Sequence, residues 1–155
     1  MCVRMKVASF DIVFQEIPGE VTLALNLSNC PCHCPGCHSQ HLAEDIGEVV
    51  TEELIDGLLA RYGAMITCVA FMGGDADPEE VARWANYVRP LKTAWYSGRM
   101  MMPQDEKAFD YVKLGPYIEA LGGLKSPTTN QRMYRREGDD WKDITSVFQK
   151  KNLAD

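Results

Sequence analysis

The chain has 155 residues, of which 46% are hydrophobic and 25% are charged, and its formal net charge is -6. This length suits one domain, residues 1–155, and is well short of the roughly 250 residues of a complete eight-stranded (βα) barrel. The negative charge argues against binding to nucleic acids or anionic membranes, and no apolar run approaches the roughly 20 residues of a membrane span. We expect a cytoplasmic protein, because unpaired thiols suit a reducing compartment.

The expected elements alternate between strands and helices. An edge strand is expected within residues 6–15, and a buried strand at residues 21–27, which are short, apolar and bounded by turn residues. Thr51, followed by Glu52 and Glu53, predicts the start of a helix, whose apolar stripe extends to residue 62. The continuous apolar run within residues 65–72 predicts a strand that is buried on both faces.

The second half of the chain continues this alternation. Asp77, Pro78 and Glu80 predict the start of a second helix, which Pro90 ends. Two further strands are expected at residues 92–96 and 111–114, with a short helix from Pro103 between them, followed by a hairpin of residues 131–136 and 141–145 around Gly138. The order predicts an α/β fold, an open, partial (βα) barrel with a curved, mainly parallel sheet and outer helices.

The most informative segment follows the strand at residues 21–27. It contains Cys30, Cys34 and Cys37 in the spacing C-x3-C-x2-C, with Cys32 expected to be a bystander in the first gap. A structural zinc site usually needs four ligands in two separated pairs, whereas a cubane iron-sulfur cluster accepts thiolates from one loop. Three cysteines leave one iron of a four-iron cluster without a protein ligand. A small molecule can chelate that iron, and ligands of α/β folds bind at the carboxyl ends of strands.

A zinc site is the main alternative from another functional class. Cys34, Cys37, His38 and His41 could bind zinc in an interaction module that has no catalytic role. Such a protein would be colourless. Cys68 lies in an apolar run and is expected to be a buried, small apolar side chain.

A second motif, Phe71-Met72-Gly73-Gly74-Asp75, ends the strand within residues 65–72. Two adjacent glycines let a ligand approach the backbone closely and leave peptide groups free to bind it. An amino-acid ligand has an ammonium group and a carboxylate to satisfy, which suits bare backbone and one acid. We therefore expect a ligand with an amino-acid moiety beside this turn.

The cysteine spacing and the Gly-Gly-acid turn resemble those of radical S-adenosylmethionine (SAM) enzymes. Together with residues 93–98 (TAWYSG), 113–117 (KLGPY) and 129–132 (TNQR), they make residues 22–134 similar to the activating proteins of anaerobic (class III) ribonucleoside-triphosphate reductases. The chain departs from the family pattern at two positions. Asp75 replaces the usual glutamate, and Lys113 lies in the stretch before Gly-Pro where family members often have an acid.

The resemblance implies a [4Fe-4S] cluster whose open iron binds SAM. Its ligands would be Cys30, Cys34 and Cys37, while the cofactor-binding residues would be Gly73, Gly74, Asp75, Ser97 and His38. In this family one electron from the cluster cleaves SAM into methionine and a 5'-deoxyadenosyl radical, which takes a hydrogen atom from a glycine of the reductase. No catalytic residue is expected beyond the cluster and SAM.

The implied partners are the large subunit of the anaerobic reductase, as protein substrate, and an electron donor such as flavodoxin or ferredoxin. A short, open sheet cannot enclose a small substrate, which favours a macromolecular one. Asn130, Gln131 and Arg132 could serve SAM, dock the reductase or only stabilise a turn. The remaining alternatives are an activase of another glycyl-radical enzyme and a small radical SAM enzyme that acts on a metabolite.

Overall fold

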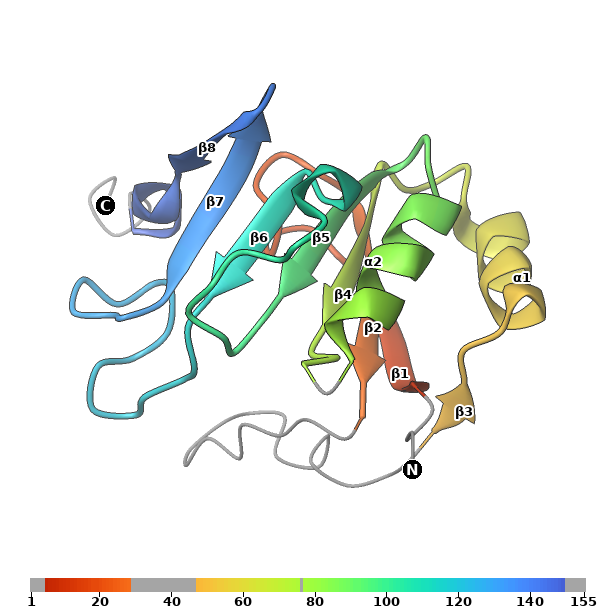
Figure 1. Ribbon diagram of the computed structural model, residues 1–155, viewed down its shortest axis with the longest axis horizontal. Helices are drawn as coiled ribbons and strands as arrows, with labels where there is room; N and C mark the ends of the chain where they lie inside the picture. Colours follow the sequence, from red (N-terminus) through yellow and green to blue (C-terminus); the bar gives the residue numbers. More distant parts are fainter. Residues whose placement is uncertain (1–4, 29–46, 76, 150–155) are drawn as a thin grey trace.

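The computed structural model describes residues 5–28, 47–75 and 77–149. They form one mixed sheet of eight strands in the order β3-β1-β2-β4-β5-β6-β7-β8, with two α-helices (Figure 1). The strands are β1 (Lys6–Val13), β2 (Thr22–Leu27), β3 (Glu48–Val49), β4 (Cys68–Met72), β5 (Lys92–Tyr96), β6 (Tyr111–Leu114), β7 (Arg132–Glu137) and β8 (Asp140–Asp143). The helices are α1 (Glu52–Tyr62) and α2 (Pro78–Tyr87).

Both helices begin where the sequence predicts them. The Thr51 hydroxyl accepts a hydrogen bond from the Leu54 amide at 3.1 Å, and the Asp77 carboxylate accepts one from the Glu80 amide at 3.2 Å. These side chains satisfy amides that have no partner within the first turn of a helix. Pro78 is the first residue of α2, where a missing N–H costs nothing.

The prediction of an α/β fold with an open sheet is confirmed, but the sheet is not mainly parallel. Only the pairs β2–β4, β4–β5 and β5–β6 are parallel, and antiparallel strands flank them on both sides. The described residues contain two α-helices, and a 3-10 turn at Glu106–Ala108 stands where a short helix from Pro103 was expected. With so few helices the expected (βα) barrel is not confirmed. The hairpin of β7 and β8 around Gly138 is confirmed.

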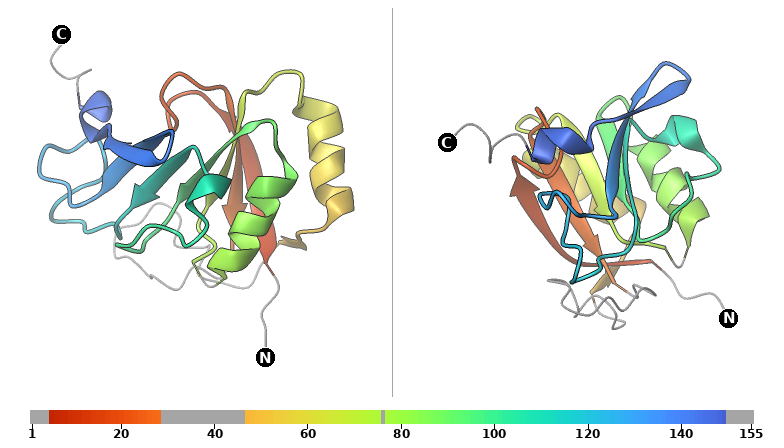
Figure 2. Two further views of the ribbon diagram at one scale, coloured as in Figure 1. Left: turned by 45° about the horizontal axis from the view of Figure 1, so that its top comes forward. Right: turned by 90° about the vertical axis from the view of Figure 1, so that its left-hand side faces the viewer.

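Each face of the sheet has its own apolar cluster. α1 and α2 lie on the same side (Figures 1 and 2), where Ile55 and Val81 join the cluster that contains Phe71. We call the opposite side the inner face. There Cys68 and Ala70 belong to a second cluster.

The loop between β1 and β2 and the carboxyl-terminal part of the chain supply the cover of the inner face. Ile17, from that loop, and Leu124, Met133 and Ile144 are buried in the same cluster as Cys68. Burial raises the pKa of the Cys68 thiol to about 12, so the thiol stays protonated at neutral pH. The prediction that Cys68 is a buried, small apolar residue is confirmed.

A buried carboxylate ties this loop to the sheet. Glu20 accepts hydrogen bonds from the hydroxyls of Thr67 and Tyr111, at 2.7 and 3.1 Å, and pairs with the Lys92 ammonium at 2.9 Å. Burial alone would raise the pKa of Glu20, but the hydrogen bonds from Lys92, Thr67 and Tyr111 outweigh it and lower the pKa below the ordinary value. Glu20 therefore stabilises the fold in its ionised form.

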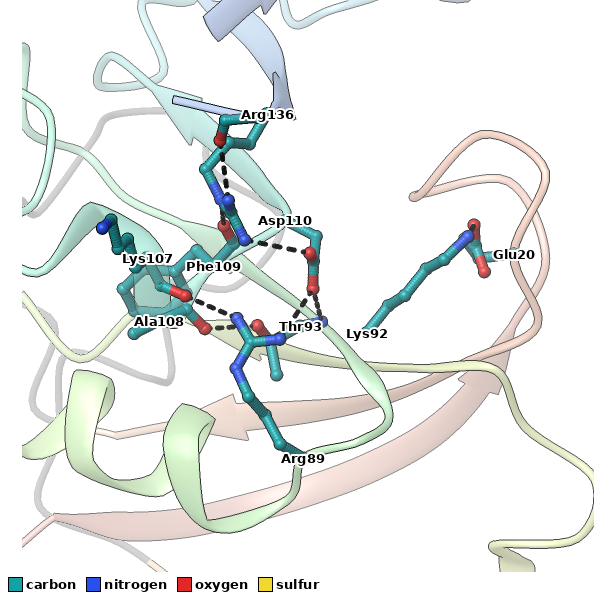
Figure 3. A network of polar contacts seen from close by, with 10 residues as sticks. Glu20, Arg89, Lys92, Thr93, Lys107, Ala108, Phe109, Asp110 and Arg136 are labelled. Atoms are coloured by element: carbon teal, nitrogen blue, oxygen red, sulfur yellow. Dashed lines mark hydrogen bonds and ion pairs between the residues drawn. The ribbon is translucent and has the colours of Figure 1, made fainter. Parts of the chain in front are cut away.

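A second polar network lies near the start of β5 and β6 (Figure 3). The Asp110 carboxylate accepts a hydrogen bond from the Thr93 amide at 2.9 Å and pairs with Arg136 at 3.5 Å and Arg89 at 3.7 Å. Arg136 also donates to the Phe109 carbonyl at 2.9 Å. These bonds join the segment after α2, the start of β6 and the end of β7.

Among residues 5–28, 47–75 and 77–149, no helix combines the length and the apolar character that crossing a bilayer requires.

Glu20→Gln should lower the free energy of unfolding by about 2 kcal/mol at neutral pH, because it removes a hydrogen-bonded charge from a buried site. The pKa of Glu20 is lowered on folding, so its contribution is complete above the ordinary value of 4.5 and is lost as the pH falls through the folded pKa. The difference between wild type and variant in urea unfolding should therefore shrink below about pH 4.5. The exposed Glu119→Gln is the control, and a pH-independent difference for Glu20→Gln would contradict the prediction.

Candidate functional site

The four parallel strands end at one edge of the sheet. Their last residues are Leu27, Met72, Tyr96 and Leu114. The described turns after β4, β5 and β6 lie side by side because the strands are parallel and in register. We call this the C-terminal edge. Hydrogen bonds link its turns, since the Gly73 amide donates to the Tyr96 carbonyl at 3.0 Å and the Ser97 amide donates to the Lys113 carbonyl at 2.8 Å.

The predicted cluster ligands Cys30, Cys34 and Cys37, and also His38, lie outside the described residues. The chain on either side of residues 29–46 is attached to β1. The Ser28 amide donates to the Lys6 carbonyl at 3.1 Å, and β3, directly after Gly47, pairs with the start of β1.

The cysteine-containing segment therefore leaves and re-enters the sheet beside the same end of β1. Residues 5–28, 47–75 and 77–149 hold no group of three or more histidine, cysteine or acidic side chains that could bind a metal. A metal centre that needs such a group would have to draw on residues outside these ranges, which include the cysteine-containing segment.

The Gly73-Gly74 turn lies next to the end of β2. Both glycines have a left-handed backbone, with φ of 98° and 83°. A Cβ atom at residue 73 would stand 3.3 Å from the Leu27 carbonyl, while one at residue 74 would stand 2.6 Å from Val81 and 2.8 Å from the Leu27 side chain. Gly74 is thus required for packing as well as for backbone conformation. The Gly73 carbonyl accepts a hydrogen bond from the Trp95 indole at 2.6 Å.

Two predicted site residues, Asp75 and Ser97, contact each other. The Ser97 hydroxyl donates to the buried Asp75 carboxylate at 2.6 Å, and the Gly98 amide donates to its other oxygen at 2.9 Å. The Arg99 guanidinium donates to the Asp75 main-chain carbonyl at 2.9 Å. The Asp75 side chain therefore fixes the turn after β4 to the turn after β5. The hydrogen bonds of Asp75 and Trp95 thus hold Gly73 and Gly74 in place.

The other predicted residues at this edge differ in their surroundings. Asn130 and Gln131 donate to the carbonyls of Pro116 and Gly115, at 3.1 and 3.3 Å, and so brace the turn after β6. Arg132 is exposed and lies 3.8 Å from Asp143, an ion pair that contributes little at a solvated surface. The geometry supports the turn-stabilising alternative for the two amides.

Two buried polar atoms at the C-terminal edge have no hydrogen-bond partner among residues 5–28, 47–75 and 77–149. One is the hydroxyl of Ser28, whose residue is 6% exposed, and the other is the side-chain carbonyl of Asn130. A buried polar atom without a partner is costly unless a ligand or another group satisfies it. Ser28 directly precedes the cysteine-containing segment, so a donor and an acceptor at this edge fit the polar end of an amino-acid-like cofactor.

Sequence reasoning missed Trp95, Arg99 and the buried Lys113. The indole of Trp95 and the guanidinium of Arg99 both hold main-chain carbonyls of the turn at residues 73–75. The Lys113 ammonium donates to the Gly115 carbonyl at 3.0 Å and lies 5.7 Å from the centre of the Tyr96 ring. Alternation along β5 could have placed Trp95 on the helix side, but no sequence signal identifies its hydrogen bond to Gly73.

Comparison with family models, with curated proteins and with solved structures gave no significant match.

Gly74→Ala should destabilise the fold more than Gly138→Ala. Both positions have positive φ, which costs about 1–2 kcal/mol for alanine, but only residue 74 adds overpacking against Val81 and Leu27, at about 1–3 kcal/mol. Nothing lies within 4 Å of the Cβ position at residue 138. Urea unfolding followed by circular dichroism measures both effects. Equal losses would show that Gly74 has no packing role.

Asp75→Ala should lower the free energy of unfolding by about 2–3 kcal/mol, because it leaves the Ser97 hydroxyl and the Gly98 amide without their charged acceptor. Asp75→Glu should also destabilise, since the residue is only 3% exposed and a further methylene in a buried, hydrogen-bonded site displaces its neighbours. Asp139→Ala, at an exposed turn, is the control for both. A fully stable Asp75→Glu variant that binds SAM more tightly would instead assign the side chain to the cofactor.

Proposed function

We propose that this protein is a radical SAM activating enzyme, which cleaves SAM reductively at a [4Fe-4S] cluster and generates a glycyl radical on the anaerobic ribonucleoside-triphosphate reductase. One observation carries the proposal. The segment with the C-x3-C-x2-C spacing starts at the carboxyl end of β2, and the Gly73-Gly74-Asp75 turn stands at the carboxyl end of the adjacent parallel strand. We infer that the four parallel strands correspond to part of the (βα) barrel expected from the sequence.

In this proposal each residue has a limited task. Cys30, Cys34 and Cys37 would hold the cluster, and the backbone of Gly73 and Gly74 would receive the methionyl end of SAM. The reduced cluster and bound SAM would supply the chemistry that removes one hydrogen atom from the target glycine, and a flavodoxin or ferredoxin would supply the electron.

The remaining site residues would act on the shape and polarity of the pocket. Asp75 and Ser97 would keep the glycine turn in position through their hydrogen bond, rather than by contact with SAM alone. The Ser28 hydroxyl and the Asn130 carbonyl would supply polar contacts at the same edge. His38 would lie near the cluster, directly after its last ligand.

The open sheet supports a protein as substrate. Antiparallel strands continue the sheet beyond β2 on one side and beyond β6 on the other, so the parallel strands do not close around a small molecule. A loop of a large protein could approach such an edge from the side. Unpaired thiols and an oxygen-sensitive cluster would suit the cytoplasm of an anaerobic cell.

Anaerobic reconstitution should give about four irons and about four sulfides per chain, with an electron paramagnetic resonance spectrum that changes when SAM is added to the reduced protein. Alanine substitution of Cys30, Cys34 or Cys37 should abolish the cluster, whereas Cys32→Ala should retain it. Adding the anaerobic reductase should then give a glycyl-radical doublet with wild type.

The controls separate the alternatives. Zinc in place of iron, or a cluster spectrum that SAM does not change, would contradict the proposal and favour a zinc-binding module. A SAM-responsive cluster that activates a different glycyl-radical enzyme, but not the reductase, would keep the chemistry and change the target.

A further inference from the structure

A groove of about 1050 Å³ lies on the helix side of the C-terminal edge, between α2 and residues 98–105. Ala82 and Asn86 line it from α2, and Trp95 contributes to its floor. The opposite wall is the methionine run at residues 100–102. The groove is therefore separate from the inner face, but it adjoins the turns after β4 and β5.

The wall formed by the methionine run is unusually exposed for apolar residues. Met100 is 65% exposed and Met101 is 77% exposed. Exposed apolar side chains that gather beside a groove indicate a binding surface. Methionine is flexible and polarisable, so it suits apolar partners whose shape varies.

The floor of the groove is bonded directly to the glycine turn of the candidate site. Trp95 holds the Gly73 carbonyl at 2.6 Å, Arg99 holds the Asp75 carbonyl at 2.9 Å, and the Gly98 amide holds the Asp75 carboxylate at 2.9 Å. All three residues also line the groove. A segment bound in the groove would thus contact residues that are themselves hydrogen-bonded to the turn proposed to hold SAM.

The charges around the groove select the kind of partner. Asp77, Glu79 and Asp105 line it, together with Arg83 and Arg99. The charge of Arg83 is balanced by Glu80, outside the lining, at 2.7 Å. The lining therefore has a surplus of negative charge, which favours a partner with a basic residue next to its apolar side chains.

We propose that this groove docks the protein that carries the target glycine, through an apolar segment flanked by a lysine or an arginine. This inference rests on the proposed function, because it identifies the surface that binds the protein substrate of the same site. Docking there would bring the partner to the C-terminal edge while leaving the inner face free.

The test compares Met100→Ser/Met101→Ser with Met65→Ser. Met65 is 62% exposed but precedes β4, at the opposite end of that strand from the groove. The double variant should bind the anaerobic reductase at least roughly tenfold more weakly and lose glycyl-radical yield at subsaturating reductase. Its SAM cleavage without reductase, driven by dithionite, should match wild type. Met65→Ser should match wild type in all three measurements.

A charge reversal tests the chemistry of the partner. Glu79→Lys should also weaken binding, and the loss should be largest at low salt. Glu53→Lys is the matched control, because both glutamates lie in the first turn of a helix and only Glu79 lines the groove.

The outcomes separate the two proposals. If wild type activates the reductase and the double serine variant binds it as tightly as Met65→Ser does, the docking inference is overturned while the proposed function stands. If wild type shows no SAM cleavage and no binding of the reductase, the proposed function fails and the docking inference fails with it.

Discussion

The parallel pairing of β2, β4, β5 and β6 is the constraint on which the rest of the molecule depends. Parallel strands in register bring the turns that follow them to one edge, although these turns are far apart in the sequence. A hydrogen bond between Asp75 and Ser97 then joins the turns after β4 and β5, and the bond from Trp95 ties the first of these turns to β5 itself. Because the glycine turn leaves so little room, Gly74 also fixes how closely β2 and α2 approach it. Fold and candidate site are thus made by the same contacts.

The two ends of the parallel strands differ in chemistry. At the start of the strands, Glu20 and Asp110 sit in networks of ion pairs and hydrogen bonds that connect distant parts of the chain. At the carboxyl ends, main-chain carbonyls are held by neutral or cationic donors. Buried polar atoms of Ser28 and Asn130 there have no partner among the residues that the structure describes. Unsatisfied polar atoms occur at both ends, since the hydroxyl of Thr22, at the start of β2, also has no partner among the described residues. Ligands of α/β folds bind at the carboxyl edge, so the unpartnered atoms of Ser28 and Asn130 are the ones placed to meet a ligand.

Local signals predicted most of the elements. Both helices were predicted from their caps at Thr51 and Asp77, and β4 was predicted from the apolar run before Gly73. Such elements can be predicted because they depend on residues that are close in the sequence. The direction of the outer strands could not be predicted, because β1 and β7 pair antiparallel through contacts that leave no periodic pattern. At the site, the sequence identified Gly73, Asp75 and Ser97 individually as candidate cofactor-binding residues. The direct bond between Asp75 and Ser97 was not foreseen, because it depends on the register of β4 and β5. The groove beside α2 was missed for a similar reason, since its walls are distant in the chain.

The way the chain flanks residues 29–46 has a consequence for the order of assembly. Ser28 is held by the Lys6 carbonyl, and Gly47 leads directly into β3, which pairs with Lys6 and Val7. The sheet alone therefore brings the two ends of this cysteine-containing segment together, and the loss of chain entropy on closing the loop is offset by strand pairing. If this segment holds the proposed cluster, the polypeptide scaffold can fold first and receive the cluster afterwards. Loading then becomes a step that a cell can time separately from synthesis.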